Sequence, residues 1–385
     1  MKALISIASL FMIVLAGGCL GSSGSSNAPT LAFVYVVGSG ANSIQALTEK
    51  STGDLVVQPV TSFPTNPRPV SLALHPSKNF LYVANFTAAT VSGFNVDHVA
   101  GILTPVGTAT PPTPVCATAG ACANPISLAI NSGGQFLVVL NQGQLVPAPG
   151  TNIPATISVF GIDATRGLLT PVAGSPFSFP SLAPGGPQAM VMSSTAGVFF
   201  VSNGGAGTIS AFSLGSGGTV TEIAGSPFTA GSDIVGLAID PKGQFLYAAD
   251  FTSSTISSFT IQSSGALAPV AGSPFPTHTG PFALAVDANG AFLFSGEQGA
   301  AGVSSFTTTG GVLKPVAGSP FVLVPSGSPQ PAFLTVDPSN TFLYVGNSGT
   351  NSISGYTIKP DGSLAPLTNS PFVQAVGPQW IAITQ

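Results

Sequence analysis

Two ionisable side chains have a spacing that could support general acid–base chemistry. His278 comes just before the apolar segment 281–286, and Glu297 ends the aromatic segment that follows it. If both segments are strands of one sheet, the imidazole could act as a base that the carboxylate orients. Arg68 comes before an equivalent apolar segment earlier in the chain and could add a cation. A surface histidine and a carboxylate that merely ends a strand would give the same pattern, so both interpretations stay open.

An internal repeat supplies the elements that must position these residues. Each copy reads approximately Leu-Ala-Ile-Asp-Pro-x-Gly-x-Phe-Leu-Tyr-Val-Ala-Asn, then Thr-Ile-Ser-x-Phe, then Gly-x-Leu-x-Pro-Val-Ala-Gly-Ser-Pro-Phe. A period of about 40–50 residues with several short strands in each unit is typical of a β-propeller. The Phe-Leu-Tyr segments of the seven copies begin at Phe33, Phe80, Phe136, Val198, Phe245, Phe292 and Phe342.

Each copy predicts a blade of four antiparallel strands. An Asp-Pro-x-Gly turn joins the first strand to the second, which is rich in aromatic and β-branched residues. The proline of the fourth strand suits an outer edge. Residues 380–383 match the first strand that the copy beginning at Phe33 lacks, so we expect them to pair with residues 33–37 and close the ring. The sequence therefore predicts one all-β domain, a seven-bladed propeller over residues 31–385.

A polar side chain ends the second strand in every copy except the first, which has Gly38 there. Together these groups could line a funnel that binds a neutral, hydroxylated ligand. Asn and Asp also end strands because their side chains bond nearby backbone groups, so a structural role is the alternative. The predicted rim residues are Asn85, Asn141, Asn203, Asp250, Glu297 and Asn347.

Three insertions lengthen the second and third copies. They cover residues 108–124, 142–154 and 179–186 and fall in connections that should reach the same rim as His278. Long connections without regular structure are often functional, so we predict that these contribute to specificity. Neutral surface decoration is the alternative.

The N-terminus has the features of a bacterial export signal. Residues 1–18 contain one lysine followed by an apolar stretch, and the segment Leu-Ala-Gly-Gly-Cys ends at Cys19. This segment resembles the lipoprotein processing box, which implies a lipid on Cys19, a tether over residues 19–30 and attachment to the membrane. We therefore expect a lipoprotein of the bacterial outer membrane, facing the periplasm or the cell surface. A plain signal peptide with an incidental cysteine is the alternative.

The other two cysteines, Cys116 and Cys122, are expected to form a disulfide. Both lie in one insertion, and export to an oxidising compartment favours their pairing. A metal site is the rival interpretation, but no histidine or acidic residue lies near them. We predict neither a metal nor a cofactor.

The low charge of the chain excludes one class of partner. Only 5% of the residues are charged and the net charge is −4, without a basic run. Nucleic-acid binding needs a positive surface, so we expect no nucleic-acid partner. No second apolar segment is long enough to span a bilayer.

The repeats resemble the YVTN-type and lactonase-type seven-bladed propellers, a family that includes bacterial 6-phosphogluconolactonase. The resemblance covers residues 31–385 and implies a catalytic set of an acid–base histidine, a glutamate and arginines that hold the substrate. The segment Asn66-Pro67-Arg68 keeps the proline and arginine of the family's His-Pro-Arg segment and has asparagine in place of the histidine. The candidates for the catalytic histidine and glutamate lie elsewhere in the chain, as His278 and Glu297. A phosphorylated lactone would need several cations, and Arg68 alone is expected on that rim.

Two hypotheses of function follow. The leading one is a non-catalytic propeller, anchored in the envelope, that binds a neutral small molecule or a protein on its Asn-rich rim. The alternative is a lactonase-like hydrolase that acts on an uncharged lactone through His278, Glu297 and Arg68.

Overall fold

The computed structural model describes residues 32–38, 40–107, 113–116, 122–183, 185–195, 197–323, 329–372 and 377–384. Cys19, the predicted signal and the predicted tether lie outside the described residues. In these ranges no helix is long and apolar enough to cross a membrane, and the one helical element is the short 3-10 turn η1 (Gly204–Ala206).

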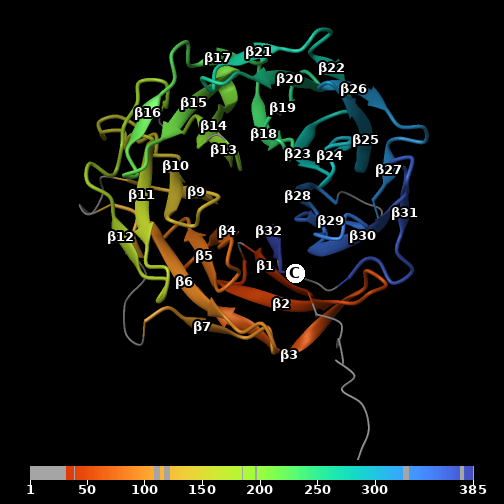
Figure 1. Cartoon of the computed structure of the whole chain (residues 1–385), viewed down its shortest axis with the longest axis horizontal. Coiled ribbons are helices and arrows are strands. Elements are labelled where there is room, and N and C mark those ends of the chain that lie inside the picture. Colours follow the sequence, from red (N-terminus) through yellow and green to blue (C-terminus); the bar gives the residue numbers. More distant parts are fainter. Residues whose placement is uncertain are drawn as a thin grey trace, which may run out of the picture. The chain divides into compact units, whose positions relative to one another are not determined.

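Seven antiparallel sheets follow one another around an axis and form the blades of a propeller (Figure 1). In each blade the first strand lies nearest the axis and the fourth lies at the periphery (Figure 1). From the axis outward, blade 1 consists of β32 (Pro378–Ile383), β1 (Ala32–Gly38), β2 (Ser43–Glu49) and β3 (Leu55–Pro64). Blade 2 consists of β4 (Pro69–Leu74), β5 (Phe80–Asn85), β6 (Thr90–Val96) and β7 (Leu103–Pro105).

The other five blades repeat this order. Blade 3 has β9 (Pro125–Ile130), β10 (Phe136–Asn141), β11 (Thr156–Ile162) and β12 (Leu169–Pro171). Blade 4 has β13 (Pro187–Met192), β14 (Val198–Asn203), β15 (Thr208–Leu214) and β16 (Val220–Glu222). Blade 5 has β18 (Ile234–Ile239), β19 (Phe245–Asp250), β20 (Thr255–Ile261) and β21 (Leu267–Pro269). Blade 6 has β23 (Pro281–Val286), β24 (Phe292–Glu297), β25 (Gly302–Thr309) and β26 (Val312–Pro315), and blade 7 has β28 (Pro331–Val336), β29 (Phe342–Asn347), β30 (Ser352–Ile358) and β31 (Leu364–Pro366).

The all-β, seven-bladed prediction is confirmed, with one addition to the blades. Four blades carry a further two-residue strand that pairs with the third strand, so these sheets have five strands rather than the predicted four. The added strands are β8 (Thr113–Pro114), β17 (Phe228–Thr229), β22 (Phe275–Pro276) and β27 (Phe321–Val322).

The predicted ring closure is also confirmed. Strand β32 pairs antiparallel with β1, with Ile383 opposite Val34 and Trp380 opposite Val37. Beyond the strand, the Thr384 N–H donates to the Phe33 carbonyl at 2.9 Å. The two ends of the chain's repeat region thus share one sheet, which leaves no unpaired inner edge at this point.

Both faces of each blade are buried because each sheet packs between two neighbours. All six residues of β5 and of β29 are buried. The Tyr82 hydroxyl donates to the Gly167 carbonyl of blade 3 at 2.8 Å, and the Tyr344 hydroxyl donates to the Gly53 carbonyl of blade 1 at 2.8 Å. Tyrosines of the second strands therefore bond neighbouring blades as well as filling the core.

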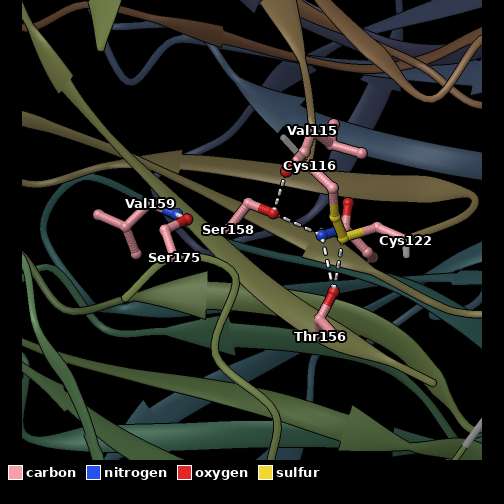
Figure 2. The surroundings of a disulfide bond; sticks show 8 residues. Val115, Cys116, Cys122, Thr156, Ser158, Val159 and Ser175 are labelled. Carbon is pink, nitrogen blue, oxygen red and sulfur yellow. Dashed lines mark hydrogen bonds between the residues drawn. A yellow bond between two sulfur atoms is a disulfide. The ribbon is translucent and has the colours of Figure 1, made fainter. Parts of the chain in front are cut away.

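The repeated Ser-Pro-Phe segment fastens the outer part of five blades. In each copy the serine hydroxyl accepts a hydrogen bond from a backbone N–H of the third strand, as Ser175 does from Val159 at 2.9 Å (Figure 2). The same bond is made by Ser226, Ser273, Ser319 and Ser370. This repetition gives the serines a structural role and not that of nucleophiles.

Candidate functional site

A central channel lies between the first strands, and Arg68 is the one predicted catalytic residue among its described lining residues. The first strands surround a cavity of about 460 Å³. Its walls are mainly apolar, with Val235, Phe282 and Trp380 among them, because the inner strands present side chains to one another across the axis. The polar groups on its walls are Arg68, Ser127, Gln142, Gln188 and Gln379.

The structure brings His278 and Glu297 together through a serine. His278 is exposed in the connection between β22 and β23, and its Nδ1 lies 3.0 Å from the Ser304 hydroxyl of β25. The Ser304 hydroxyl also interacts with the Glu297 carboxylate. Glu297 is fully buried at the end of β24, and its Oε1 accepts a hydrogen bond from the Thr277 hydroxyl at 2.6 Å.

Burial raises the pKa of Glu297 to about 7, against the opposing effect of hydroxyls from Thr277, Ser304 and Ser295. Its second oxygen, Oε2, is buried and has no hydrogen-bond partner of regular geometry among the described residues. A carboxylate with such a pKa can take up and release a proton near neutral pH, as a general acid or base must.

Arg68 lies at the mouth of the same channel but on blade 2, which is three blades away from blade 6 around the ring. It is exposed, and its guanidinium carbon lies 4.1 Å above the ring of Phe86. Its backbone N–H donates to the Asn42 side chain at 2.9 Å, in a conformation with φ of 58°. The structure therefore places Arg68 beside the channel without joining it to the His278 cluster.

Four asparagines of the predicted rim direct their amides into their own blades. All four are buried, and each Nδ2 donates to a serine of the third strand. The pairs are Asn85 with Ser92 at 3.0 Å, Asn141 with Ser158 at 2.8 Å, Asn203 with Ser210 at 2.9 Å and Asn347 with Ser354 at 2.8 Å. These bonds fix the second strand to the third. Their Oδ1 atoms are buried without a hydrogen-bond partner among the described residues.

Asp250, the remaining rim residue, holds a loop of its own blade. Burial raises its pKa, but backbone and hydroxyl hydrogen bonds from Ser232 and Ser253 outweigh this effect and lower the pKa overall. Gly231 is required beside it, because a Cβ there would lie 2.1 Å from the Asp250 carboxylate.

Glu297 differs in hydrogen-bonding chemistry from the asparagines at the equivalent positions. An amide Nδ2 donates to its serine, whereas an ionised carboxylate can only accept from it. A Ser304 hydroxyl that donates to an ionised Glu297 can accept from His278 only in the tautomer that carries the proton on Nδ1, and this tautomer has its lone pair on Nε2. Ser304 was missed in the sequence analysis, although the repeat register places a serine two residues before each third-strand aromatic residue.

The insertions of the second and third blades contact one another on this rim. The Asn124 side chain donates to the Gly143 carbonyl at 3.0 Å, and the Gly185 N–H donates to the Gln142 carbonyl at 2.8 Å. Gln142 and Gln188 line the channel beside them. Residues 108–112 and 117–121 of the first insertion lie outside the described residues.

Cys116 and Cys122 form a disulfide in the first insertion, with Cα atoms 5.9 Å apart (Figure 2). The sulfur of Cys122 accepts a hydrogen bond from the Thr156 hydroxyl, and the Ser158 hydroxyl donates to the Val115 carbonyl at 2.5 Å. The disulfide is thus attached to blade 3 next to Asn141. No cluster of three metal-ligating side chains occurs in the described part of the chain.

Comparison with known proteins supports the lactonase resemblance. A family model described as "Lactonase, 7-bladed beta-propeller" matches residues 180–281. A search of curated protein sequences found no match.

Solved structures share the fold over nearly the whole chain. The periplasmic gluconolactonase of Pseudomonas aeruginosa has a TM-score of 0.75 at 16% identity and covers 92% of this chain and 99% of its own. A Bacteroides fragilis protein provisionally named 6-phosphogluconolactonase has a TM-score of 0.74 at 18% identity, covering 94% of this chain and 100% of its own. A Bacteroides uniformis protein of the same provisional name has a TM-score of 0.73 at 18% identity, with 92% and 99% covered.

These findings confirm the resemblance to lactonase-type seven-bladed propellers. The family match favours the lactonase-like alternative over the non-catalytic interpretation that the sequence analysis placed first. The reactions named for the solved structures belong to those proteins.

Proposed function

We propose that this propeller hydrolyses uncharged lactones at the mouth of its central channel. His278 is the general base, and Glu297 is a positioning residue that acts through Ser304. The observation that carries the proposal is the contact of His278 with Ser304 beside the buried Glu297 carboxylate in blade 6. Glu297 stands where four other blades have asparagine, and Ser304 links it to an exposed histidine.

The reaction needs one proton acceptor and one proton donor, and His278 can supply both. Its Nε2 takes a proton from a water molecule, whose oxygen forms a bond to the lactone carbonyl carbon. The bond between this carbon and the ring oxygen then breaks, and the ring oxygen takes the proton from the imidazolium. The product is the open hydroxy acid. Glu297 stabilises the imidazolium through Ser304, because its negative charge favours the protonated form.

The walls of the channel favour a substrate without charge. Arg68 is the cation among the residues that line it, so a phosphate group would meet one positive charge. The apolar side chains Val235, Phe282 and Trp380 would instead stabilise an alkyl or aryl substituent by burying it. The glutamines are suited to hydroxyl or carbonyl groups of the lactone.

A panel of lactones tests this proposal. We expect turnover above the spontaneous rate for gluconolactone and for δ-lactones with alkyl chains, and a lower kcat/KM for 6-phosphogluconolactone. The measurement is proton release at constant pH, with buffer alone and heat-denatured protein as controls. Absence of turnover for every lactone would reject the hydrolase proposal.

The second candidate is non-catalytic binding of a neutral ligand or protein on the same rim. The apolar channel with three glutamines favours it, since such a cavity can bind without reacting. In that case the lactones or their hydroxy acids would bind in calorimetry, and none would be hydrolysed.

We further propose that the mature chain is a lipoprotein that begins at Cys19 and is held in the bacterial envelope, with the propeller outside the cytoplasm. The segment Leu15–Cys19 and the disulfide between Cys116 and Cys122 support this proposal. Cells that express the full chain should incorporate labelled palmitate into the wild type and not into Cys19→Ala. Equal labelling of the two proteins, or no label in either, would contradict it.

A further inference from the structure

One carboxyl group occupies a repeat position that is apolar in most of the other blades. Glu49 ends β2 and pairs with Leu55 of the fourth strand. At the same register position, blades 2 to 7 have Val96, Ile162, Leu214, Ile261, Thr308 and Ile358. The Glu49 side chain is buried, so an ionisable group stands where a core side chain is usual.

Tyrosines of the second strands reach this part of the neighbouring blade. The Tyr35 hydroxyl donates to the Gly101 carbonyl of blade 2 at 3.1 Å, and Tyr82 makes the equivalent bond to blade 3. At these two junctions the third-strand position is apolar, so each hydroxyl proton goes to a glycine carbonyl. Tyr344 makes the same bond to the Gly53 carbonyl of blade 1, at 2.8 Å.

At the junction of blades 7 and 1, three oxygen atoms form two short hydrogen bonds. Besides its bond to Gly53, the Tyr344 oxygen lies 2.7 Å from Oε1 of Glu49. Burial raises the pKa of Tyr344 far above its usual range, so the hydroxyl keeps its single proton. A carbonyl oxygen can only accept, so a hydroxyl that donates to Gly53 must accept from Glu49. Glu49 can donate only as the protonated acid.

The charged groups around Glu49 do not compensate an ionised carboxylate. Asp337 acts on it from the turn between β28 and β29, Asp54 lies in the turn after β2, and Lys50 is exposed. In the described part of the chain no salt bridge involves Glu49. Burial raises the pKa of Glu49 to about 7, and the charge of Asp337 acts in the same direction, against the effect of the Tyr344 hydroxyl.

We propose that Glu49 is a proton-dependent latch between blades 7 and 1, closed while its carboxyl donates to Tyr344 and released when the carboxyl ionises. An ionised Glu49 can only accept, so it takes the hydrogen bond of Tyr344, and the Gly53 carbonyl loses its donor. The buried negative charge also favours the entry of water into the junction. Because blade 1 closes the ring, this proton controls how firmly the ring is closed. The latch lies outside the His278 site and acts whether or not the propeller is an enzyme.

Hydrogen exchange of the mature propeller, followed by mass spectrometry, tests the latch. An opening that releases one proton becomes about tenfold more favourable for each pH unit between the pKa values of the open and closed states. We therefore expect the protection factors of peptides from β2, its following turn and β29 to fall about 10- to 100-fold from pH 5 to pH 8. In Glu49→Gln the amide donates to Tyr344 at every pH, so these peptides should keep their protection.

Glu297→Gln is the matched control, because it removes another buried carboxyl from a distant blade. It should keep the pH dependence that the wild type shows in the peptides of β2 and β29. Equal protection at pH 5 and pH 8 in the wild type, or the same fall in Glu49→Gln, would overturn the proposal.

Infrared spectroscopy detects the proton itself and decides the case in which Glu49→Gln fails to fold. The chain has three glutamates, Glu49, Glu222 and Glu297. In the double variant Glu222→Gln/Glu297→Gln, isotope-labelled glutamate therefore reports on Glu49 alone. We expect the C=O band of a protonated acid at pH 5 and its replacement by a carboxylate band with a midpoint near pH 7. A carboxylate band already complete at pH 5 would overturn the proposal.

Discussion

Deletion of residues 378–385 should open the ring and leave a protein that no longer unfolds cooperatively at the wild-type temperature. The deletion removes β32, the inner strand of blade 1, and exposes the edge of β1. It also removes the buried Ile381 and the Trp380 ring, whose centroid lies 4.8 Å from that of Phe333 in blade 7. Burial of each large apolar side chain contributes about 1.5–3 kcal/mol. The loss is therefore a large part of the typical stability of about 5–15 kcal/mol.

Thermal and urea unfolding followed by circular dichroism measure this effect. The matched control is a circular permutant that joins residue 384 to residue 32 through a short linker and opens the exposed turn at Ser216. It keeps β32 on β1 and should retain most of the wild-type stability. A deletion variant that melts like the wild type would show that β32 does not close the ring.

Replacement of either His278 or Glu297 should remove most of the proposed lactonase activity. General acid–base catalysis typically contributes about 10²–10⁴-fold, so we expect kcat/KM to fall by that factor in His278→Ala. In Glu297→Gln the side-chain amide would donate to Ser304 as the asparagines do in other blades, so Ser304 could no longer fix His278 in the reactive tautomer. This variant should therefore fold normally and lose activity through kcat.

His98→Ala is the matched control for His278→Ala. His98 is exposed on the opposite rim, where its Nε2 lies 3.0 Å from Asn79. Its replacement should leave turnover unchanged. Equal activity in the wild type, His278→Ala and Glu297→Gln would show that neither residue takes part in the reaction.

The raised pKa of Glu297 also has a consequence for stability. Its folded-state value of about 7 exceeds the ordinary value of 4.5, so the folded state binds more protons than the unfolded state between these two values. The free energy of unfolding should therefore fall as the pH rises through this window, by about 1.4 kcal/mol for each unit of pKa difference. Burial also raises the pKa of Glu49 to about 7, so this residue should likewise make the free energy of unfolding fall as the pH rises. Glu297→Gln should remove its own part of this pH dependence.

The sequence predicts the fold well because the repeat carries most of the core. The Phe-Leu-Tyr register places every second strand, and the match between residues 380–383 and the inner strands predicts the closing pair. The added two-residue strands were not predicted, since the Ser-Pro-Phe segment contains a proline and is too short to show a strand pattern.

The site was less predictable because side-chain direction at a strand end is not encoded in the residue type. Asn141 or Asn347 could face the funnel or its own blade, and the serines of the third strands draw them into the blade. The proximity of His278 and Glu297 was predicted from their common repeat, but Ser304 looked like any other serine of the pattern. The apolar channel was also not predicted, because the inner strands are apolar on both faces and show no alternation of apolar and polar residues.

The pH profile of kcat/KM for an uncharged δ-lactone, in the wild type and in Glu297→Gln, tests the central claim most directly. Glu297 supports the reaction only when it is ionised, so kcat/KM of the wild type should rise with pH through an apparent pKa near 7, the value to which burial raises this carboxyl. The ratio of wild-type to Glu297→Gln kcat/KM should therefore be small at pH 5, where Glu297 is protonated, and large at pH 9, where it is ionised. A wild-type rate that does not change between pH 5 and pH 9, or a ratio that does not change with pH, would contradict the account.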